Sequence, residues 1–391
     1  SWYLRNPEYR SRVQKLVQSA FAGKPEDIIS QSVAKALYGE VSPYSATRLE
    51  RFAACAFAHF LQYGMKLTER VEYEFKPMDM GNVMHEALES FAEEVRKRGM
   101  KWTELTEQER NEIADRCLDN IVADYGNTVL KSSARNEYMI ERTRRILRRT
   151  VWALQKQLEQ GEFQPEGFEV TFGGGRIDRV DIMEDQNKVY VKVIDYKTGN
   201  TSFDLVYLYH GLQLQLMIYL DGALRVEQKK YPDKEIIPAG VFYYNIKDPM
   251  IQEKIDADVE AVSAGLMKEL KMNGLVQADP ELVYRMDSSL GSIPVAFNKD
   301  GNFRKNSSVA DRTQFAVLGR YVRTKIEKIR SSILEGDAEV SPYELGKKNA
   351  CTYCPYMTVC GFDRRLSGYE FRRLKNFSDE ELWKAFDREA E

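Results

Sequence analysis

Carboxylates and a lysine lie close together in the segment 175–199, which reads GRIDRVDIMEDQNKVYVKVIDYKTG. The run 189–195 alternates apolar and polar residues and is rich in valine, which predicts a strand, and 176–182 is predicted as its neighbour. Side chains two positions apart on a strand share a face, so Asp195 and Lys197 point the same way. The pattern therefore places an acid and an amine at one spot on a sheet.

This combination suits the hydrolysis of phosphodiesters. Carboxylates bind Mg²⁺ or Mn²⁺, the metal lowers the pKa of a bound water, and an ammonium can orient that water or stabilise charge on the phosphate. Asp178 and Asp181 are three residues apart and lie on opposite faces of a regular strand, so only one of them can join Asp195 unless a bulge intervenes. Spacing alone does not choose between them. The alternative is a strand end and turn with solvated Asp and Lys side chains.

The order of GRID, IDYK and QLQLMIY resembles the PD-(D/E)XK nucleases of the RecB type. The resemblance implies a restriction-endonuclease-like α/β core, a mixed sheet flanked by helices. It assigns the catalytic positions to Asp178, Asp195, Lys197, Gln215 and Tyr219. It also implies His85, four residues after Gly81, as a metal ligand beside Asp178 and Asp195, with Mg²⁺ or Mn²⁺ as the ion. The alternative for His85 is a capped or partly buried helix residue.

Three of the five cysteines form a second motif, C-x2-C-x5-C, at Cys351, Cys354 and Cys360. A disulfide framework is not expected because the sequence shows no secretory signal, so a metal or cluster site is favoured. Cys117 falls in a predicted helix and is expected to be half buried.

The segment around Cys55, SATRLERFAACAFAHF, resembles the one that supplies a fourth ligand in AddB-type nuclease subunits. The resemblance implies a 4Fe-4S cluster held by Cys55, Cys351, Cys354 and Cys360, with Zn²⁺ as the alternative. Such a cluster would close a loop of roughly 300 residues and is expected to be a structural staple, worth about 5 kcal/mol on the scale used for disulfides.

Composition predicts a soluble protein with a sizeable core, and no apolar run reaches the length needed to cross a bilayer. We therefore expect a cytoplasmic location and no membrane partner. The net charge of −3 argues against a uniformly basic DNA-coating protein, but arginines cluster locally. Arg142, Arg145 and Arg149 are predicted to contact DNA phosphates together with Arg144 and Arg148, and a second basic group lies at 364–375; the alternative for both is a solvated surface.

The expected organisation is a helical segment over 1–40, a nuclease domain over 41–375 and a C-terminal helix over 376–391. Within the nuclease domain we expect a helical insert at about 86–160, an α/β core at about 166–251 and the cysteine loop at 351–360. Predicted strands are 166–172, 175–183, 188–196 and 238–245. Predicted helices include one from Ser45 to Gly64, 209–225, 254–272 and about 309–335, and ELVYRM is predicted as a short strand.

By resemblance, the function is that of a metal-dependent DNA exonuclease domain in a helicase-nuclease complex, which repairs double-strand breaks by homologous recombination. It would cut the 5'-terminated single strand, bind single strands and duplex ends, and pair with an AddA-type helicase-nuclease subunit. No G-x4-G-K-[ST] loop occurs, so this chain shows no ATPase motif. The alternatives are a stand-alone iron-sulfur exonuclease of the CRISPR-adaptation type and a non-catalytic module that binds DNA ends.

Overall fold

A computed structural model describes residues 2–20, 28–39, 45–68, 77–124, 133–173, 175–252 and 258–390. The chain divides into two compact units. The first unit comprises 1–70, 208–212 and 323–384. The second unit comprises 71–207, 213–322 and 385–391, and contains the segment 175–199.

Within the described residues, the second unit is built on a mixed sheet of six strands in the order β1-β2-β3-β4-β5-β6. The strands are β1 (Gln164–Phe172), β2 (Gly175–Asp185), β3 (Lys188–Lys197), β4 (Glu235–Asn245), β5 (Asn273–Gln277) and β6 (Val309–Ala310). β1, β2 and β3 are antiparallel neighbours, whereas β3 and β4 are parallel. The predicted strands and the α/β fold class with a mixed sheet are therefore confirmed. β2 continues two residues further than expected, so the tight turn is Gln186-Asn187.

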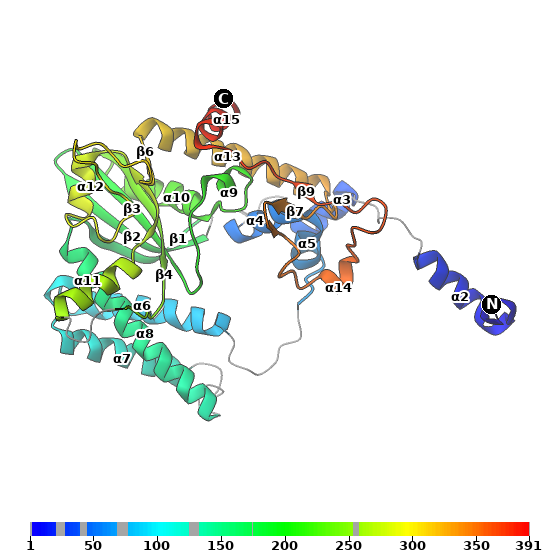
Figure 1. Ribbon diagram of the computed structural model, residues 1–391, viewed down its shortest axis with the longest axis horizontal. Helices are drawn as coiled ribbons and strands as arrows, with labels where there is room; N and C mark the ends of the chain where they lie inside the picture. Colours follow the sequence, from blue (N-terminus) through cyan, green and yellow to red (C-terminus); the bar gives the residue numbers. More distant parts are fainter. Residues whose placement is uncertain are drawn as a thin grey trace. The chain divides into compact units, whose positions relative to one another are not determined.

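Helices pack on this sheet because its strands present apolar side chains on both faces. One face meets a group of helices that lie side by side in Figure 1, namely α6 (Pro77–Lys97), α7 (Glu107–Asp124) and α8 (Ala134–Glu159). Their buried residues form one core with Ile194, Tyr196 and Tyr244 of the sheet. Helix α10 (Gln215–Lys230) packs against β3 and β4. The remaining helices of the unit are η2 (Trp102–Glu104), α11 (Val259–Glu269) and α12 (Pro280–Met286).

The first unit consists mainly of short elements. Its helices are α1 (Trp2–Arg5), α2 (Pro7–Ala20), α3 (Gln31–Tyr38), α4 (Ala46–Ala54), α5 (Ala56–His59), the π-helix η1 (Phe60–Gly64) and α14 (Met357–Cys360). A small sheet has the order β8-β7-β9, from β7 (Tyr343–Leu345), β8 (Lys348–Asn349) and β9 (Arg372–Arg373). Three helices contribute residues to both units, α9 (Leu205–Tyr209), α13 (Arg312–Glu335) and α15 (Asp379–Ala390).

Three secondary-structure predictions were wrong. ELVYRM forms helix α12, because the Asp279 side chain accepts hydrogen bonds at the N-terminus and Pro280 fits the first turn. The helix expected from Ser45 to Gly64 is interrupted at Cys55, whose backbone is extended. The helix expected at 209–225 is divided into α9 and α10, with Gly211 at a positive φ of 78° between them.

Two further expectations concern helices in the second unit. Helix 254–272 begins at Val259 and ends at Glu269, and 253–257 lie outside the described residues. Cys117 lies in α7 and is buried at 5% exposure, more than expected. None of the described helices is both long and apolar enough to cross a membrane.

Candidate active site

Asp178 and Asp195 come from neighbouring antiparallel strands. Arg179 of β2 lies opposite Ile194 of β3, so Asp178 and Asp195 are the next residues along the two strands. Asp178 Oδ2 also accepts a hydrogen bond from the Tyr196 N–H at 2.7 Å. Both acids are buried, with 8% and 1% exposure. The sheet register therefore brings together the two acids that the sequence implied.

Lys197 connects these acids to helix α10. Its Nζ lies 2.6 Å from Asp195 Oδ2, as expected from strand parity, and donates to Gln215 Oε1 at 2.7 Å. The Gln215 amide in turn donates to the Tyr219 hydroxyl at 2.9 Å, across one turn of α10. Gln215 and Tyr219 thus fix the position of the ammonium.

His85 reaches the acids from helix α6. Its Nδ1 lies 3.4 Å from Asp178 Oδ2, and its ring contacts Tyr196 edge-on. Gly81, one turn earlier, lies close to the residue after β3: a Cβ there would lie 3.4 Å from Thr198 Oγ1. Position 81 of α6 therefore lies in van der Waals contact with Thr198, which follows the end of β3.

Glu169 of β1 also belongs to this group, although none of the sequence motifs points to it. Its Oε1 lies 3.7 Å from His85 Nδ1, and its Oε2 lies 2.7 Å from Arg176 Nε. Ligand atoms of His85, Glu169 and Asp178 all lie within 4.8 Å of one another. No local sequence motif marks Glu169, because it joins the group only through the pairing of β1 with β2.

Asp181 lies on the opposite face of the sheet from Asp178. Its carboxylate is 2.5 Å from Arg179 Nε and 3.0 Å from Lys192 Nζ, and it is fully buried. Burial alone would raise the pKa of Asp181, but the charges of Arg179 and Lys192 hold the pKa below its usual value. The register of β2 with β3 is regular from Arg179 to Asp185, so no bulge moves Asp181 toward Asp195.

Burial and neighbouring charges shift the pKa values of two residues in the site. Burial and then the charge of Asp178 raise the pKa of Asp195 to about 7. Burial alone would lower the pKa of His85, but hydrogen bonds to Asp178 and Glu169 raise it to about 10. Carboxylates packed at this spacing repel one another, and a bound cation would relieve the repulsion. The donor set of carboxylate oxygens with one imidazole fits a divalent ion such as Mg²⁺ or Mn²⁺.

The four cysteines of the predicted cluster lie together in the first unit. Cys55, Cys351, Cys354 and Cys360 line one small apolar cavity, and none forms a disulfide. The extended backbone at Cys55 ends α4 and begins α5, which places this residue at a helix junction. Cys351 and Cys354 lie in the loop after β8, where Asn349 accepts hydrogen bonds from the Cys351 and Thr352 N–H groups, and Cys360 is the last residue of α14.

The thiols perturb one another. Burial raises the pKa of the Cys55 thiol. Burial and the proximity of the other three sulfurs raise the pKa of Cys351 to about 12. Thiolates so close together need a positively charged partner, and four cysteine ligands fit either an iron-sulfur cluster or zinc.

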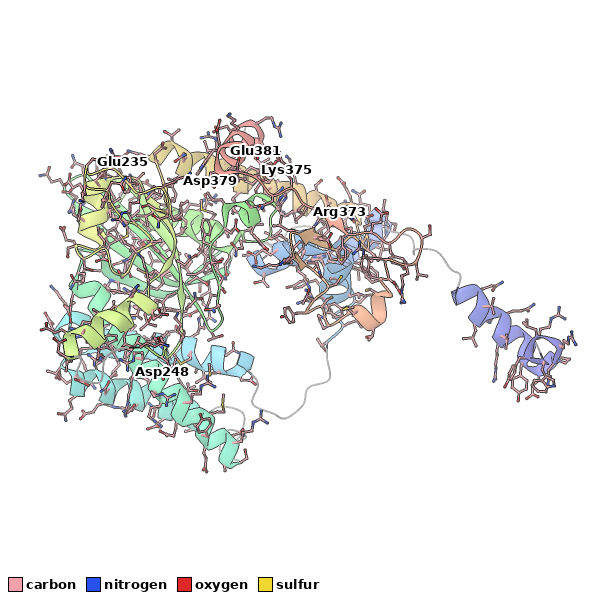
Figure 2. The ribbon with its side chains drawn as sticks, in the orientation of Figure 1. Glu235, Asp248, Arg373, Lys375, Asp379 and Glu381 are labelled. Carbon is pink, nitrogen blue, oxygen red and sulfur yellow. The ribbon has the colours of Figure 1, made fainter. Side chains whose placement is uncertain are left out.

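The predicted DNA-contacting arginines lie on α8 and line a cavity of about 760 Å³ in the second unit. Arg145 and Arg149 both face one carboxylate, that of Asp248, at 2.5 and 3.9 Å; Asp248 is labelled beside the helices in Figure 2. Arg148 instead pairs with Asp115, through Nε at 2.8 Å. Arg142 is exposed on the same helix. Of the second basic group, Arg365 pairs with Asp363 and Lys375 with Glu381.

Comparison with known proteins gives a consistent result. The profile of the PD-(D/E)XK nuclease superfamily matches residues 43–361. A protein of Lachnoclostridium phytofermentans, named as a subunit of an ATP-dependent helicase/deoxyribonuclease, is 42% identical over 98% of this chain and 35% of its own length. Proteins with the same name from a Thermoanaerobacter species and Clostridium acetobutylicum are each 34% identical, over 100% and 99% of this chain and 36% of their own lengths. The chain spans about a third of the length of these relatives.

Proposed function

Because the chain belongs to the PD-(D/E)XK nuclease superfamily, we propose that its second unit hydrolyses phosphodiester bonds of DNA at the site formed by Asp178, Asp195 and Lys197. The observation that carries the proposal is the ammonium of Lys197 at 2.6 Å from Asp195, next to Asp178 on the adjoining strand. The relatives' name, which includes deoxyribonuclease, supports DNA as the substrate.

In this proposal His85, Asp178 and Asp195 hold Mg²⁺ or Mn²⁺. The ion supplies Lewis acidity and a nucleophilic water at neutral pH. Lys197 orients the attacking water or stabilises charge on the scissile phosphate. Gln215 accepts from the ammonium and Tyr219 accepts from the Gln215 amide, so both act as positioning residues.

We further propose that the enzyme is an exonuclease that shortens the 5'-terminated single strand beside an AddA-type helicase-nuclease subunit in the repair of double-strand breaks by recombination. The relatives' name describes one subunit of a helicase/deoxyribonuclease, which supports such a partner. Arg142, Arg145 and Arg149 would guide the phosphate backbone, since two of these arginines share a single carboxylate.

The test uses linear single-stranded DNA labelled at either end, circular single-stranded DNA, and the Lys197→Ala variant. The expected result is Mg²⁺-dependent shortening of the linear strand from its 5' end, intact circles, and a loss of about 10²–10³ in rate for the variant. Equal cleavage by Lys197→Ala would refute the assignment of the site. Cleavage of the circular DNA would show that the enzyme also cuts internal bonds, which would contradict a purely exonucleolytic activity. Binding of ends without cleavage would indicate a non-catalytic module.

For the first unit, we propose that the four cysteines hold a structural 4Fe-4S cluster. Anaerobically purified protein is expected to be brown with broad visible absorbance, and Cys354→Ala to be colourless and less resistant to urea. Cys117→Ala, a buried cysteine of the second unit, is the control and should keep the colour. A colourless protein that contains zinc would instead support the alternative metal.

A further inference from the structure

We propose that Glu169 of β1 is an additional protein ligand of the divalent ion, beside His85 and Asp178. The inference rests on the metal-dependent activity proposed above. Glu169 is not one of the motif residues, which are at positions 178, 195, 197, 215 and 219.

A bulge in β1 brings Glu169 into line with the acids. Pro165 lies opposite Asp181, but Gly167 lies opposite Val180, so Glu166 is an extra residue in β1. After this bulge Phe168 pairs with Arg179 and Val170 with Ile177, which leaves Glu169 opposite Asp178. Without the extra residue, Phe168 would lie at that position.

After the bulge, one face of β1 is apolar and the other carries the acid. Phe168 stacks on Trp102 with the rings 3° from parallel and 5.7 Å apart, and the Arg179 guanidinium lies 5.7 Å from the centre of each ring. This face is apolar and belongs to the helical layer. Glu169 therefore points to the other face, where Asp178 lies.

The backbone at Glu169 is strained. Its φ is +49°, in the left-handed region that residues with a side chain rarely adopt inside a strand. Such conformations cost of order 1–3 kcal/mol and cluster at functional sites. The strain accompanies a specific placement, since the Glu169 side chain is only 9% exposed and faces His85.

The pairing across three strands gives a row of acids, Glu169, Asp178 and Asp195. Like charges opposite each other on neighbouring strands are destabilising. Arg176 offsets part of this repulsion from the outside, through Glu169 Oε2 at 2.7 Å, and its side chain is 63% exposed. The other oxygen, Oε1, faces His85. One carboxylate oxygen is thus held by arginine, and the second is directed at the group of metal-binding residues.

The experiment measures Mn²⁺ binding to the 391-residue chain by electron paramagnetic resonance of the free ion, without DNA. Glu169→Gln is expected to weaken Mn²⁺ binding about tenfold or more, since even outer-shell substitutions cost that much. Asp178→Asn is expected to weaken it at least as much. Glu166→Gln, on the same strand but paired with Lys230, is the matched control and should bind as the wild type does.

Arg176→Gln distinguishes a ligand from a purely structural residue. If Glu169 serves only as the partner of Arg176, the Glu169→Gln and Arg176→Gln variants will change the Mn²⁺ affinity equally, which overturns the proposal. If Glu169 is a ligand, Arg176→Gln changes the affinity by less than about threefold. Normal Mn²⁺ binding by Glu169→Gln together with loss in Asp178→Asn refutes this inference but leaves the proposed function intact. Absence of Mn²⁺ binding by the wild type refutes both.

Discussion

Asp178 and Asp181, three residues apart on β2, lie on opposite faces of the sheet and have opposite surroundings. Asp178 lies 3.4 Å from His85 and beside a second acid, whereas Asp181 is held between two cations. One carboxylate is therefore placed where negative charge accumulates, and the other where it is neutralised. The two residues should respond differently to the same substitution.

Asp181→Asn is expected to lower the free energy of unfolding by about 3–5 kcal/mol, because it leaves Arg179 and Lys192 buried without their counter-charge. Asp178→Asn should leave the metal-free stability within about 1 kcal/mol, since it removes both the like-charge repulsion with Asp195 and the ion pair with His85. Urea unfolding in EDTA measures both. Equal losses in the two variants would contradict the separation of roles.

Gln215→Ala is expected to lower kcat about tenfold, because Lys197 keeps Asp195 but loses the second acceptor that fixes its ammonium. Tyr219→Phe should have a smaller effect, since Tyr219 acts on the lysine only through Gln215. Steady-state cleavage of single-stranded DNA, analysed for kcat and KM separately, provides the measurement. A change confined to KM would place Gln215 in substrate binding instead.

His59 should make the first unit sensitive to acid. It is fully buried, its Nε2 accepts from Arg48 at 3.2 Å, and burial with the charges of Arg48 and Arg51 lowers its pKa to about 3. The unfolded chain binds a proton below about pH 6.5, whereas the folded state does not until about pH 3. Stability is therefore lost as pH falls from about 6.5 to 3, by up to about 1.4 kcal/mol per pH unit.

His59→Gln tests this dependence because glutamine can accept from Arg48 but does not titrate. The expected outcome is a shallower fall in unfolding free energy between about pH 6.5 and 4, measured by urea titration at several pH values. Parallel pH profiles for the variant and the wild type would show that another group controls acid sensitivity.

Arg145→Ala is expected to weaken binding of single-stranded DNA and to reduce the slope of log K against log salt by about 0.7, the value for one phosphate contact. Arg148→Ala is the matched control from the same helix, because Asp115 binds that guanidinium through both Nε and Nη2. Filter binding across a range of salt concentrations separates the two. Identical slopes for both variants and the wild type would indicate that the α8 arginines form a solvated surface and do not contact phosphates.

Sequence patterns predicted the sheet and much of the site because strand parity is local. Asp195 and Lys197 share a face whatever the rest of the chain does, and the valine-rich run marks β3 directly. Asp178 and Asp181 could be placed on opposite faces, but only the positions of His85 and Arg179 show which face each acid occupies. Glu169 was missed because its place depends on one extra residue, Glu166, in its own strand and on the pairing of that strand with β2.

Other errors followed from competing local signals. ELVYRM contains residues that favour strands, but the preceding Asp279-Pro280 pair is a helix start. The break at Cys55 has no such signal, since the residues on both sides favour helix. It is explained by long-range contacts, such as the Phe57 N–H donating to the Glu339 carbonyl.

The position of the cysteines along the chain has a consequence for biosynthesis. Cys55 precedes the segment 175–199, and Cys351, Cys354 and Cys360 follow it. A polypeptide released before Cys351 would carry every acid and the lysine of the candidate active site but a single thiol of the four. If the cysteines hold the proposed cluster, it is assembled only on chains whose translation has passed the nuclease residues.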